Sequence, residues 1–186
     1  MFIKFNKEES MSLIKTVDPE KAEGIVKEVF DTMLENVGMI PAPMQLASAS
    51  PGLLDISWQS LQYFSQHPKL GFGLLCTIRY LAAQQADFAF CTSLNKNFLM
   101  QQGMTEEDIE ALEKDPSKAP LEDNERAMLA FVIKAIKAPD TVAQGDIDQL
   151  HEAGWGDGDI LDALTHGTNM IGSSILMKTF KMDMTC

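Results

Sequence analysis

The sequence predicts an all-α protein of about eight or nine helices, and three observations lead to this prediction. Apolar residues recur at steps of three and four through most of the chain. Residues that favour helix starts stand directly before many of these stretches. No window alternates apolar and polar residues with a period of two, and the turn pair Asn-Gly is absent from the sequence, so strands have no support.

The N-terminal half predicts four helices. The first begins at Asp18, an N-cap residue followed by proline at the first helical position, and ends at Gly38. Ser50, again followed by proline, starts a second long helix, and a short helix is expected between the two at about residues 44–49. The next helix, at about residues 69–86, is apolar on nearly every side, which is typical of a helix buried between others.

The C-terminal half predicts five further helices. Asp87 is expected to cap the first of them. Residues 105–108, which begin with Thr105, resemble a capping box, in which two residues cap each other across the first turn of a helix. Residues 141–144, which begin with Thr141, are predicted to form a true capping box. Gly154 is expected to end the fourth. The expected ranges are about residues 87–103, 105–114, 122–137, 141–154 and 158–180.

Charge and composition limit the partners of this chain. Fifteen Lys and Arg residues against 27 Asp and Glu residues give a net charge of −12, which repels phosphate backbones and anionic membrane surfaces. We therefore expect neither nucleic acid nor a membrane as a partner. The apolar run at residues 128–133 is far shorter than the roughly 20 residues of a membrane span, and the first residues do not resemble a secretory signal. Three cysteines do not make a disulfide framework, so the composition predicts a cytoplasmic protein.

The length of 186 residues corresponds to about one domain. We expect a single domain over residues 18–186, preceded by an N-terminal extension of residues 1–17. The helix expected near residues 70–83 is apolar all round, and the chain holds 12 Met and 10 Phe residues. This is more apolar surface than one small layer hides, so we expect a homo-oligomer with large apolar interfaces.

A set of short motifs, mostly in the C-terminal half, resembles one family. The motifs are Asn-Glu-Arg-Ala at residues 124–127, Pro-Asp-Thr at 139–141, Asp-Ile-x-x-Leu at 146–150 and Gly-Trp-Gly-Asp-Gly-Asp-Ile-Leu at 154–161. Together with residues 74–103, they resemble the carboxymuconolactone decarboxylase / alkyl hydroperoxidase D (AhpD-like) family, in particular its peroxidase-related branch. The resemblance spans about residues 18–180. It implies the AhpD-like helical fold, an alkyl hydroperoxidase or peroxiredoxin activity in antioxidant defence, no metal or organic cofactor, and a trimer or hexamer.

The redox motif of that family is largely replaced in this chain. Redox members carry a glutamate, twelve residues later the first cysteine of Cys-x-x-Cys, and a histidine four residues after the second cysteine. These positions correspond here to Cys76, Phe88, Cys91 and Asn95. Phenylalanine cannot attack or resolve a disulfide, and an amide takes up no proton near neutral pH. The resemblance therefore implies that the usual dithiol cycle cannot run within this helix, and whether the protein is an enzyme stays open.

Cys91 and Asn95 are candidate catalytic residues on one face of their expected helix, a face they share with Phe88 and Leu99. Cys91 is either a reactive thiol near a helix N-terminus or an inert packing thiol. The charge of Asp87 and the surrounding phenylalanines favour the second interpretation, because both raise a thiol pKa. Asn95 binds either a backbone carbonyl or a ligand, since a buried amide without partners is costly.

Cys76 is a third candidate. In the family the corresponding glutamate lies across from the second cysteine, so the resemblance places Cys76 near Cys91 on an adjacent helix. One interpretation is a relocated thiol pair, with Cys91 attacking, Cys76 resolving and Arg79 favouring a thiolate. The other is that both thiols only fill core space. A disulfide requires Cα atoms within about 7 Å of each other.

His166 is the fourth candidate, on the last expected helix beside Ala163 and Met170. It is either a core or interface histidine or the acid/base group of a pocket. His67 and His151 are expected on the surface. No His, Cys or acidic residues have metal-ligand spacing, so no metal site is expected.

Three classes of function follow from these residues. The first is a peroxidase. The second is a cofactor-independent, non-redox enzyme, such as a lactone decarboxylase or isomerase, that uses Asn95 and His166. The third is a binding or scaffold protein that has lost catalysis. The partner expected for the enzyme classes is a small molecule in an apolar pocket, which the methionines of this chain suit.

Overall fold

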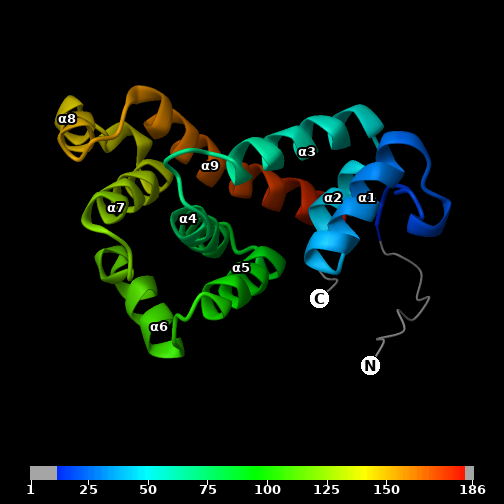
Figure 1. Cartoon of the computed structure of the whole chain (residues 1–186), viewed down its shortest axis with the longest axis horizontal. Coiled ribbons are helices and arrows are strands. Elements are labelled where there is room, and N and C mark those ends of the chain that lie inside the picture. Colours follow the sequence, from blue (N-terminus) through cyan, green and yellow to red (C-terminus); the bar gives the residue numbers. More distant parts are fainter. Residues whose placement is uncertain (1–11, 183–186) are drawn as a thin grey trace. The chain divides into compact units, whose positions relative to one another are not determined.

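A computed structural model describes residues 12–182 of the chain. These residues form nine α-helices and three short 3₁₀-helices, with no strand among them, so the all-α prediction is confirmed. The α-helices, labelled in Figure 1, are α1 (Gly24–Val37), α2 (Ala42–Ala47), α3 (Pro51–Ser65), α4 (Phe72–Gln85), α5 (Ala89–Gln101), α6 (Glu106–Lys114), α7 (Asp123–Lys137), α8 (Gln144–Glu152) and α9 (Asp157–Thr179). The 3₁₀-helices are Pro19–Lys21, Pro116–Lys118 and Pro139–Thr141.

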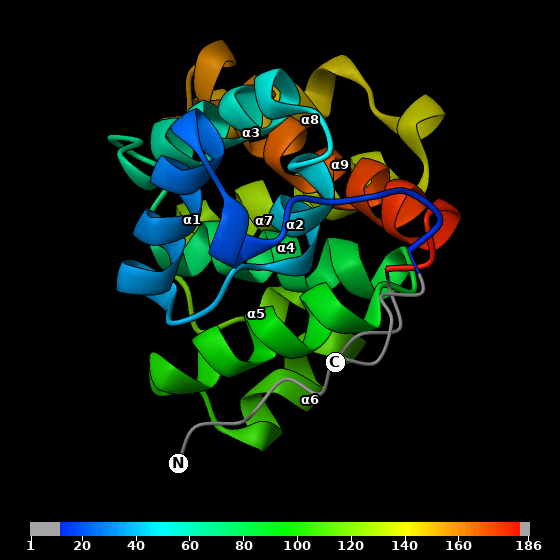
Figure 2. The same cartoon turned by 90° about the vertical axis from the view of Figure 1, so that its right-hand side faces the viewer.

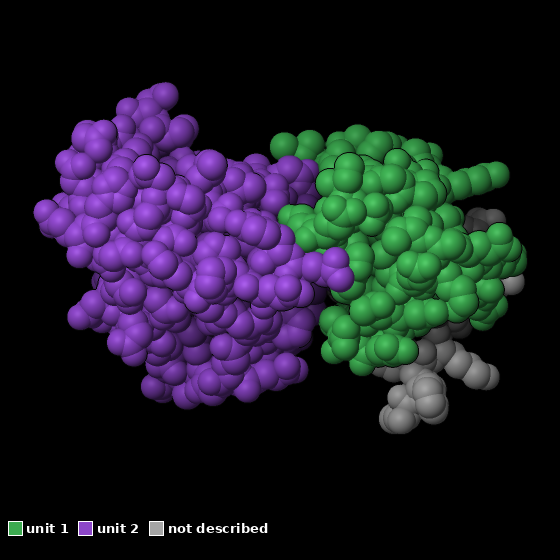
Figure 3. Space-filling view, turned by 45° about the horizontal axis from the view of Figure 1, so that its top comes forward, with its two compact units in different colours: residues 1–61, 175–186 green, residues 62–174 purple. Residues whose placement is uncertain are grey.

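The chain forms two compact units, coloured separately in Figure 3. The first unit comprises residues 1–61 and 175–186, and the second comprises residues 62–174. Each unit has a hydrophobic cluster made of its own residues. The single domain over residues 18–186 and the extension of residues 1–17 stay predictions.

The first unit is built around α1, whose apolar stripe buries Val26, Val29, Phe30 and Met33. The helix ends where the sequence indicated, at a left-handed Gly38 with φ +77°. Its start was predicted wrongly. Asp18 caps the 3₁₀-helix Pro19–Lys21, and the extended residues 22 and 23 then delay α1 until Gly24. An Asp-Pro pair fits the first turn of either helix type, so the local signal did not distinguish them.

The second unit is built around α4, which packs mainly against α5 and α7 and lies between these two helices in Figures 1 and 2. Its residues are buried on nearly all sides, as its apolar sequence predicted. The helix begins at Phe72 rather than near residue 69. The reason is His67, whose Nδ1 accepts the backbone N–H groups of Lys69 and Leu70 and so satisfies them outside a helix.

Two predicted helix caps are corrected by the structure. Phe88, not Asp87, occupies the N-cap position of α5, because Asp87 takes a left-handed conformation with φ +48° at the end of the α4–α5 turn. Thr141 does not open a capping box: its hydroxyl donates to the carbonyl of Ala138 within a 3₁₀-helix. The start of α8 is capped instead by Asp146, which accepts the N–H of Ala143 at 2.8 Å. The capping box predicted at the start of α6 is confirmed.

A glycine lets α9 approach its neighbours closely in the second unit. A Cβ atom on Gly167 would lie 2.9 Å from side-chain carbons of Val132 and Ile136 on α7 and 3.2 Å from Ile78 on α4. Such distances are shorter than ordinary van der Waals contact. The absence of a side chain therefore brings the neighbouring His166 within reach of polar groups on α4.

Candidate functional site

Four polar side chains meet inside the second unit and form what we call the central cluster. They are Cys76 and Arg79 of α4, Asn95 of α5 and His166 of α9. Three of the four are site residues predicted from the sequence. The structure thus brings together residues that are far apart along the chain, with Arg79 as their common neighbour.

Arg79 lies at the centre of the cluster. Its Nε donates to Oδ1 of Asn95 at 2.7 Å, and its Nη1 donates to Nε2 of His166 at 3.1 Å. The guanidinium also stands 5.7 Å from the centre of the Phe72 ring, whose own neighbour is the Phe98 ring at 6.0 Å. Burial lowers the pKa of Arg79. Among residues 12–182 no carboxylate pairs with this arginine.

Asn95 is buried, and its amide is held by protein groups. Nδ2 donates to the carbonyl of Cys91, one helical turn earlier, at 2.8 Å. Oδ1 accepts from Arg79 and, at 3.6 Å, from the thiol of Cys76, which also reaches the Asn95 carbonyl at 3.5 Å. Of the two roles left open by the sequence, the backbone carbonyl contact is the one observed. Asn95 also orients the guanidinium of Arg79.

His166 is a neutral hydrogen-bond acceptor in this arrangement. A guanidinium has only donors, so Nε2 of His166 must accept from Arg79, and the ring proton belongs on Nδ1. The ring packs on Phe64 with its centre 4.4 Å from the Phe64 ring centre. Burial, and next the charge of Arg79, lower the pKa of His166 to about 3, while a hydrogen bond to the backbone of Leu75 acts in the opposite direction. The imidazole is therefore neutral near neutral pH, and the imidazolium form that would act as an acid is not populated.

Cys76 and Cys91 are free thiols, and both are buried. Burial raises the pKa of each, that of Cys91 to about 12, and the nearby charge of Arg79 only partly opposes this. Both sulfurs are therefore uncharged near neutral pH. Cys76 contacts Asn95, one turn beyond Cys91 on α5, and the relocated thiol pair stays a prediction. The third cysteine, Cys186, lies outside the described residues.

A second polar group in the same unit, which we call the edge cluster, consists of Tyr63, His67, Lys69, Asp159 and Asp162. The surface position predicted for His67 is wrong, because only 4% of its side chain is exposed. The turn at the following proline folds the ring back over the chain, and Nε2 faces Oδ2 of Asp162 at 3.3 Å. The Tyr63 hydroxyl donates to the same oxygen at 2.5 Å, and Lys69 pairs with Asp159 at 2.7 Å. His151, by contrast, lies on the surface as predicted and faces Asp157.

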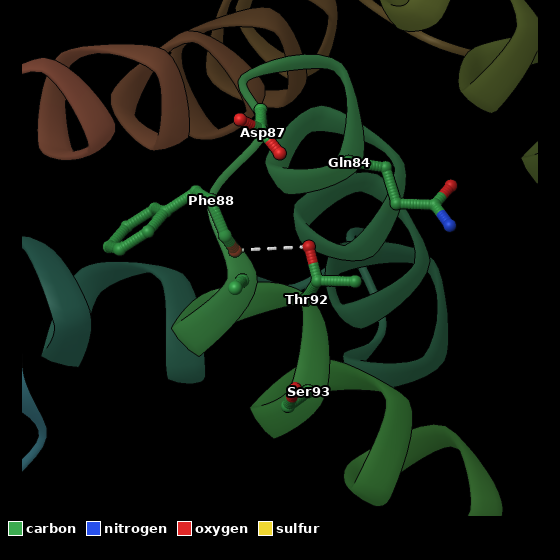
Figure 4. A pocket seen from close by; sticks show the side chains of 6 residues that line it. Gln84, Asp87, Phe88, Thr92 and Ser93 are labelled. Carbon is green, nitrogen blue, oxygen red and sulfur yellow. Dashed lines mark hydrogen bonds between the residues drawn. The ribbon is translucent and has the colours of Figure 1, made fainter. Parts of the chain in front are cut away.

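A surface hollow of about 370 Å³ lies at the turn between α4 and α5, and Figure 4 shows it from close by. Its lining includes no member of the central cluster. Thr92 donates its hydroxyl to the carbonyl of Phe88, four residues earlier in the sequence, and the Phe88 ring points away from the polar side chains there. The hollow is lined by Gln84, Asp87, Phe88, Ala89, Thr92 and Ser93. The apolar ligand pocket expected from the sequence stays a prediction.

Between residues 12 and 182 no three or more His, Cys, Asp or Glu side chains are grouped so that they could hold a metal ion. In the same part of the chain no helix is both long and apolar enough to cross a membrane. The metal-free chemistry expected from the sequence is not tested by this.

The importance of Arg79 was underestimated from the sequence, which indicated it only as a neighbour of Cys76. One signal was available. The chain has two arginines, and Arg79 stands in the middle of a stretch that is otherwise apolar on nearly every side. A charged residue in such a helix must find polar partners on neighbouring helices, which makes it a candidate site residue.

The helix arrangement defines a class of fold. No protein-family model matches the sequence, and no curated protein matches it significantly. Solved structures do match, over more than nine tenths of both chains, and they show that this protein has the AhpD-like fold indicated by the sequence motifs.

Two of the matching structures are described as peroxidase-related proteins, and a third is a debrominase. An uncharacterised peroxidase-related protein from Ralstonia eutropha JMP134, described as an alkylhydroperoxidase AhpD core, has a TM-score of 0.78 at 17% identity and covers 94% of this chain and 93% of its own. A peroxidase-related protein from Silicibacter sp. TM1040 has a TM-score of 0.75 at 18% identity, with 95% and 93% covered. The debrominase Bmp8 has a TM-score of 0.73 at 15% identity, with 91% and 90% covered.

Proposed function

We propose that this AhpD-like, peroxidase-related protein uses its central cluster on a small molecule without a thiol–disulfide cycle. Of the three classes left open by the sequence, this is the non-redox enzyme. The observation that carries the proposal is the half-buried guanidinium of Arg79, which is held by neutral acceptors beside two uncharged thiols. Such a site is equipped to bind and polarise an oxygen-bearing ligand rather than to attack a peroxide.

The state of the thiols argues against the peroxidase class. A peroxide is attacked by a thiolate, and a thiol with a pKa of about 12 is ionised to roughly one part in 10⁵ at pH 7. Asn95 cannot remove the thiol proton, and His166, with its pKa near 3, is a very weak base. The family positions that assist the thiol in redox members therefore offer no activation here.

A solved relative supports a small-molecule role for this fold. The Bmp8 debrominase has also been solved as its C82A variant in complex with 2,3,4-tribromopyrrole, with a TM-score of 0.73 at 14% identity and 91% of each chain covered. Tribromopyrrole is a flat aromatic compound. We propose a ligand of similar size for the present chain, with Asn95 and His166 as groups that position Arg79 for it.

Peroxide consumption with a dithiol reductant tests the proposal directly. We expect the wild-type protein to consume hydrogen peroxide and an organic hydroperoxide no faster than its Cys91→Ser and Cys76→Ser variants. The matched control is Cys186→Ser, which removes the thiol that lies outside the described residues. Turnover by the wild type that disappears in Cys91→Ser and persists in Cys186→Ser would contradict the proposal.

We also propose that the protein is a cytoplasmic homo-oligomer, a trimer or hexamer. Large apolar side chains exposed within the first unit support this, namely Leu53 and Ile56 on α3 and Ile175 and Leu176 on α9. Light scattering on the purified protein is expected to give a mass of at least three chains. A stable monomer at micromolar concentration would overturn it.

A further inference from the structure

We infer that Arg79 is the receptor for the acidic group of a small aromatic carboxylate. The inference rests on the proposed non-redox function and names the class of ligand for it. Its basis is the absence of an acidic partner for Arg79 among the described residues. The chain has 27 acidic residues for 15 Lys and Arg, so acids are abundant, yet Arg79 pairs with none among the described residues.

The other arginine of the chain provides a reference. Arg126 is bound by the carboxylate of Asp123 and by the carbonyl of Leu121, in the way usual for this side chain. Both arginines are half-buried, but the acceptors of Arg79, Asn95 and His166, are both neutral. Partial burial of a cation without a counter-charge is unfavourable, because hydration is lost and no ion pair replaces it. A bound anion would supply the missing charge.

The guanidinium has donors left for such an anion. Of its five N–H groups, one on Nε goes to Asn95 and one on Nη1 goes to His166. The Cys76 thiol is a third neighbour, and it is uncharged, so it does not neutralise the cation. The two fixed hydrogen bonds hold the planar fork in one orientation. A carboxylate matches the remaining donors, because its two oxygens accept in parallel from a guanidinium.

Two phenylalanines indicate that the part of the ligand next to its carboxylate is an aromatic ring. The Phe72 ring stands over the guanidinium, with its edge contact to Phe98 on α5. Phe72 is 54% exposed and is the first residue of α4, so its ring is free to turn without disturbing the buried core. A flat aromatic ligand can take the place of this ring over the cation or stack against it, with its carboxylate on Arg79.

Calorimetric titration with three probes tests the ligand class. Benzoate has the carboxylate and the ring, benzamide has the ring without the charge, and acetate has the charge without the ring. We expect benzoate to bind the wild-type protein at least tenfold more tightly than either of the others. Arg79→Met should weaken benzoate binding by tenfold to a hundredfold, because a charge-assisted hydrogen-bond pair is lost. The matched control, Arg126→Met, should bind benzoate like the wild type.

A second measurement, the protection of Arg79 by benzoate, uses the unaltered protein, so it does not depend on the folding of a variant. Phenylglyoxal modifies accessible arginines, and mass spectrometry of peptides assigns the modification to Arg79 or Arg126. We expect benzoate to protect Arg79 and leave Arg126 unprotected, and Phe72→Ala to increase the labelling of Arg79 severalfold. Circular dichroism confirms that each variant is folded.

The outcomes separate this inference from the proposed function. Benzoate binding that is unchanged in Arg79→Met, equal binding of benzoate and benzamide, or no binding and no protection at millimolar benzoate overturns the inference. If peroxide turnover is also absent, the proposed non-redox function survives that result. Peroxide turnover that depends on Cys91 overturns the proposed function, whatever the result of the benzoate titration. Selective benzoate binding through Arg79 without turnover supports both.

Discussion

The central and edge clusters of the second unit differ in the partners of their cationic side chains. Each contains one histidine and at least one cationic side chain, and each joins α9 to an earlier part of the chain. In the edge cluster, Lys69 has Asp159 as a partner and His67 has Asp162. In the central cluster, Arg79 and His166 have only each other and neutral groups.

Because of this difference, we expect the edge cluster to stabilise the fold and the central cluster not to stabilise it. Paired charges with satisfied hydrogen bonds hold elements together at modest cost near the surface. A half-buried cation without an acid costs stability. Burial, and next the charge of this cation, depress the pKa of the histidine beside it. We therefore expect the edge cluster to respond to mutation as a structural element, and the central cluster as a binding site.

The largest expected effect is a pH dependence of stability that comes from His166. Its pKa is about 3 in the folded protein against an ordinary value of 6.5, so only the unfolded chain takes up this proton at mildly acidic pH. Its contribution is fully present above pH 6.5 and is lost as the pH falls towards 3, at about 1.4 kcal/mol per pH unit. Urea unfolding at pH 6.5 and 4.5 should show a loss more than about 2 kcal/mol larger in the wild type than in His166→Gln.

His151 provides the control for this prediction, since it is exposed and faces Asp157. His151→Gln should show the same pH dependence as the wild type. The titration of carboxylates contributes equally to the pH dependence of all three proteins, so this contribution cancels when they are compared. If the wild type and His166→Gln lose equal free energy between the two pH values, the assignment of a neutral, proton-resistant imidazole to the central cluster is wrong.

A smaller effect is expected when the edge cluster is broken. Asp162→Ala removes the acceptor shared by the Tyr63 hydroxyl and the buried His67 ring, and it should lower the free energy of unfolding by about 1 to 2 kcal/mol. Asp157→Ala is the matched control: its side chain is 89% exposed, so a change below about 0.5 kcal/mol is expected in urea titrations at pH 7. If the two substitutions change the free energy of unfolding equally, the edge cluster does not have the structural role expected of it.

The smallest effect is expected for Arg79→Met in the absence of ligand. The substitution removes a half-buried cation that has no acidic partner and keeps most of the volume, but it leaves Nε2 of His166 without its donor. These terms oppose each other, so the free energy of unfolding should change by less than about 1 kcal/mol. A loss above about 3 kcal/mol would mean that Arg79 is a structural residue, and the contrast between the clusters would disappear.

Local sequence signals predicted most of the helices because capping and periodicity act within a few residues. The left-handed end of α1 at Gly38 and the capping box of α6 followed from such signals. Where they failed, a nearby alternative competed for the same hydrogen bonds. Asp146 replaced Thr141 at the start of α8, and the backbone conformation of Asp87 moved the cap of α5 to Phe88.

The candidate site was predicted only in part. Family resemblance and helical periodicity pointed to Cys76, Asn95 and His166 as separate candidates. They did not indicate that Arg79 joins them, because Arg79 meets Asn95 across 16 positions and His166 across 87 positions of the sequence. The burial of His67 was missed for the same reason, since its partner Asp162 lies 95 positions away.

The sequence by itself determined the all-α class, the order of the helices and their apolar faces, because these depend on local propensity and on the separation of apolar from polar residues. Only the tertiary structure decided which polar residues share the interior, and with what protonation. Gly167 allows α9 to pack tightly against α4 and α7, so His166 reaches the guanidinium of Arg79 and loses its affinity for a proton. Desolvation and charge proximity act through space, and helix packing alone sets those distances.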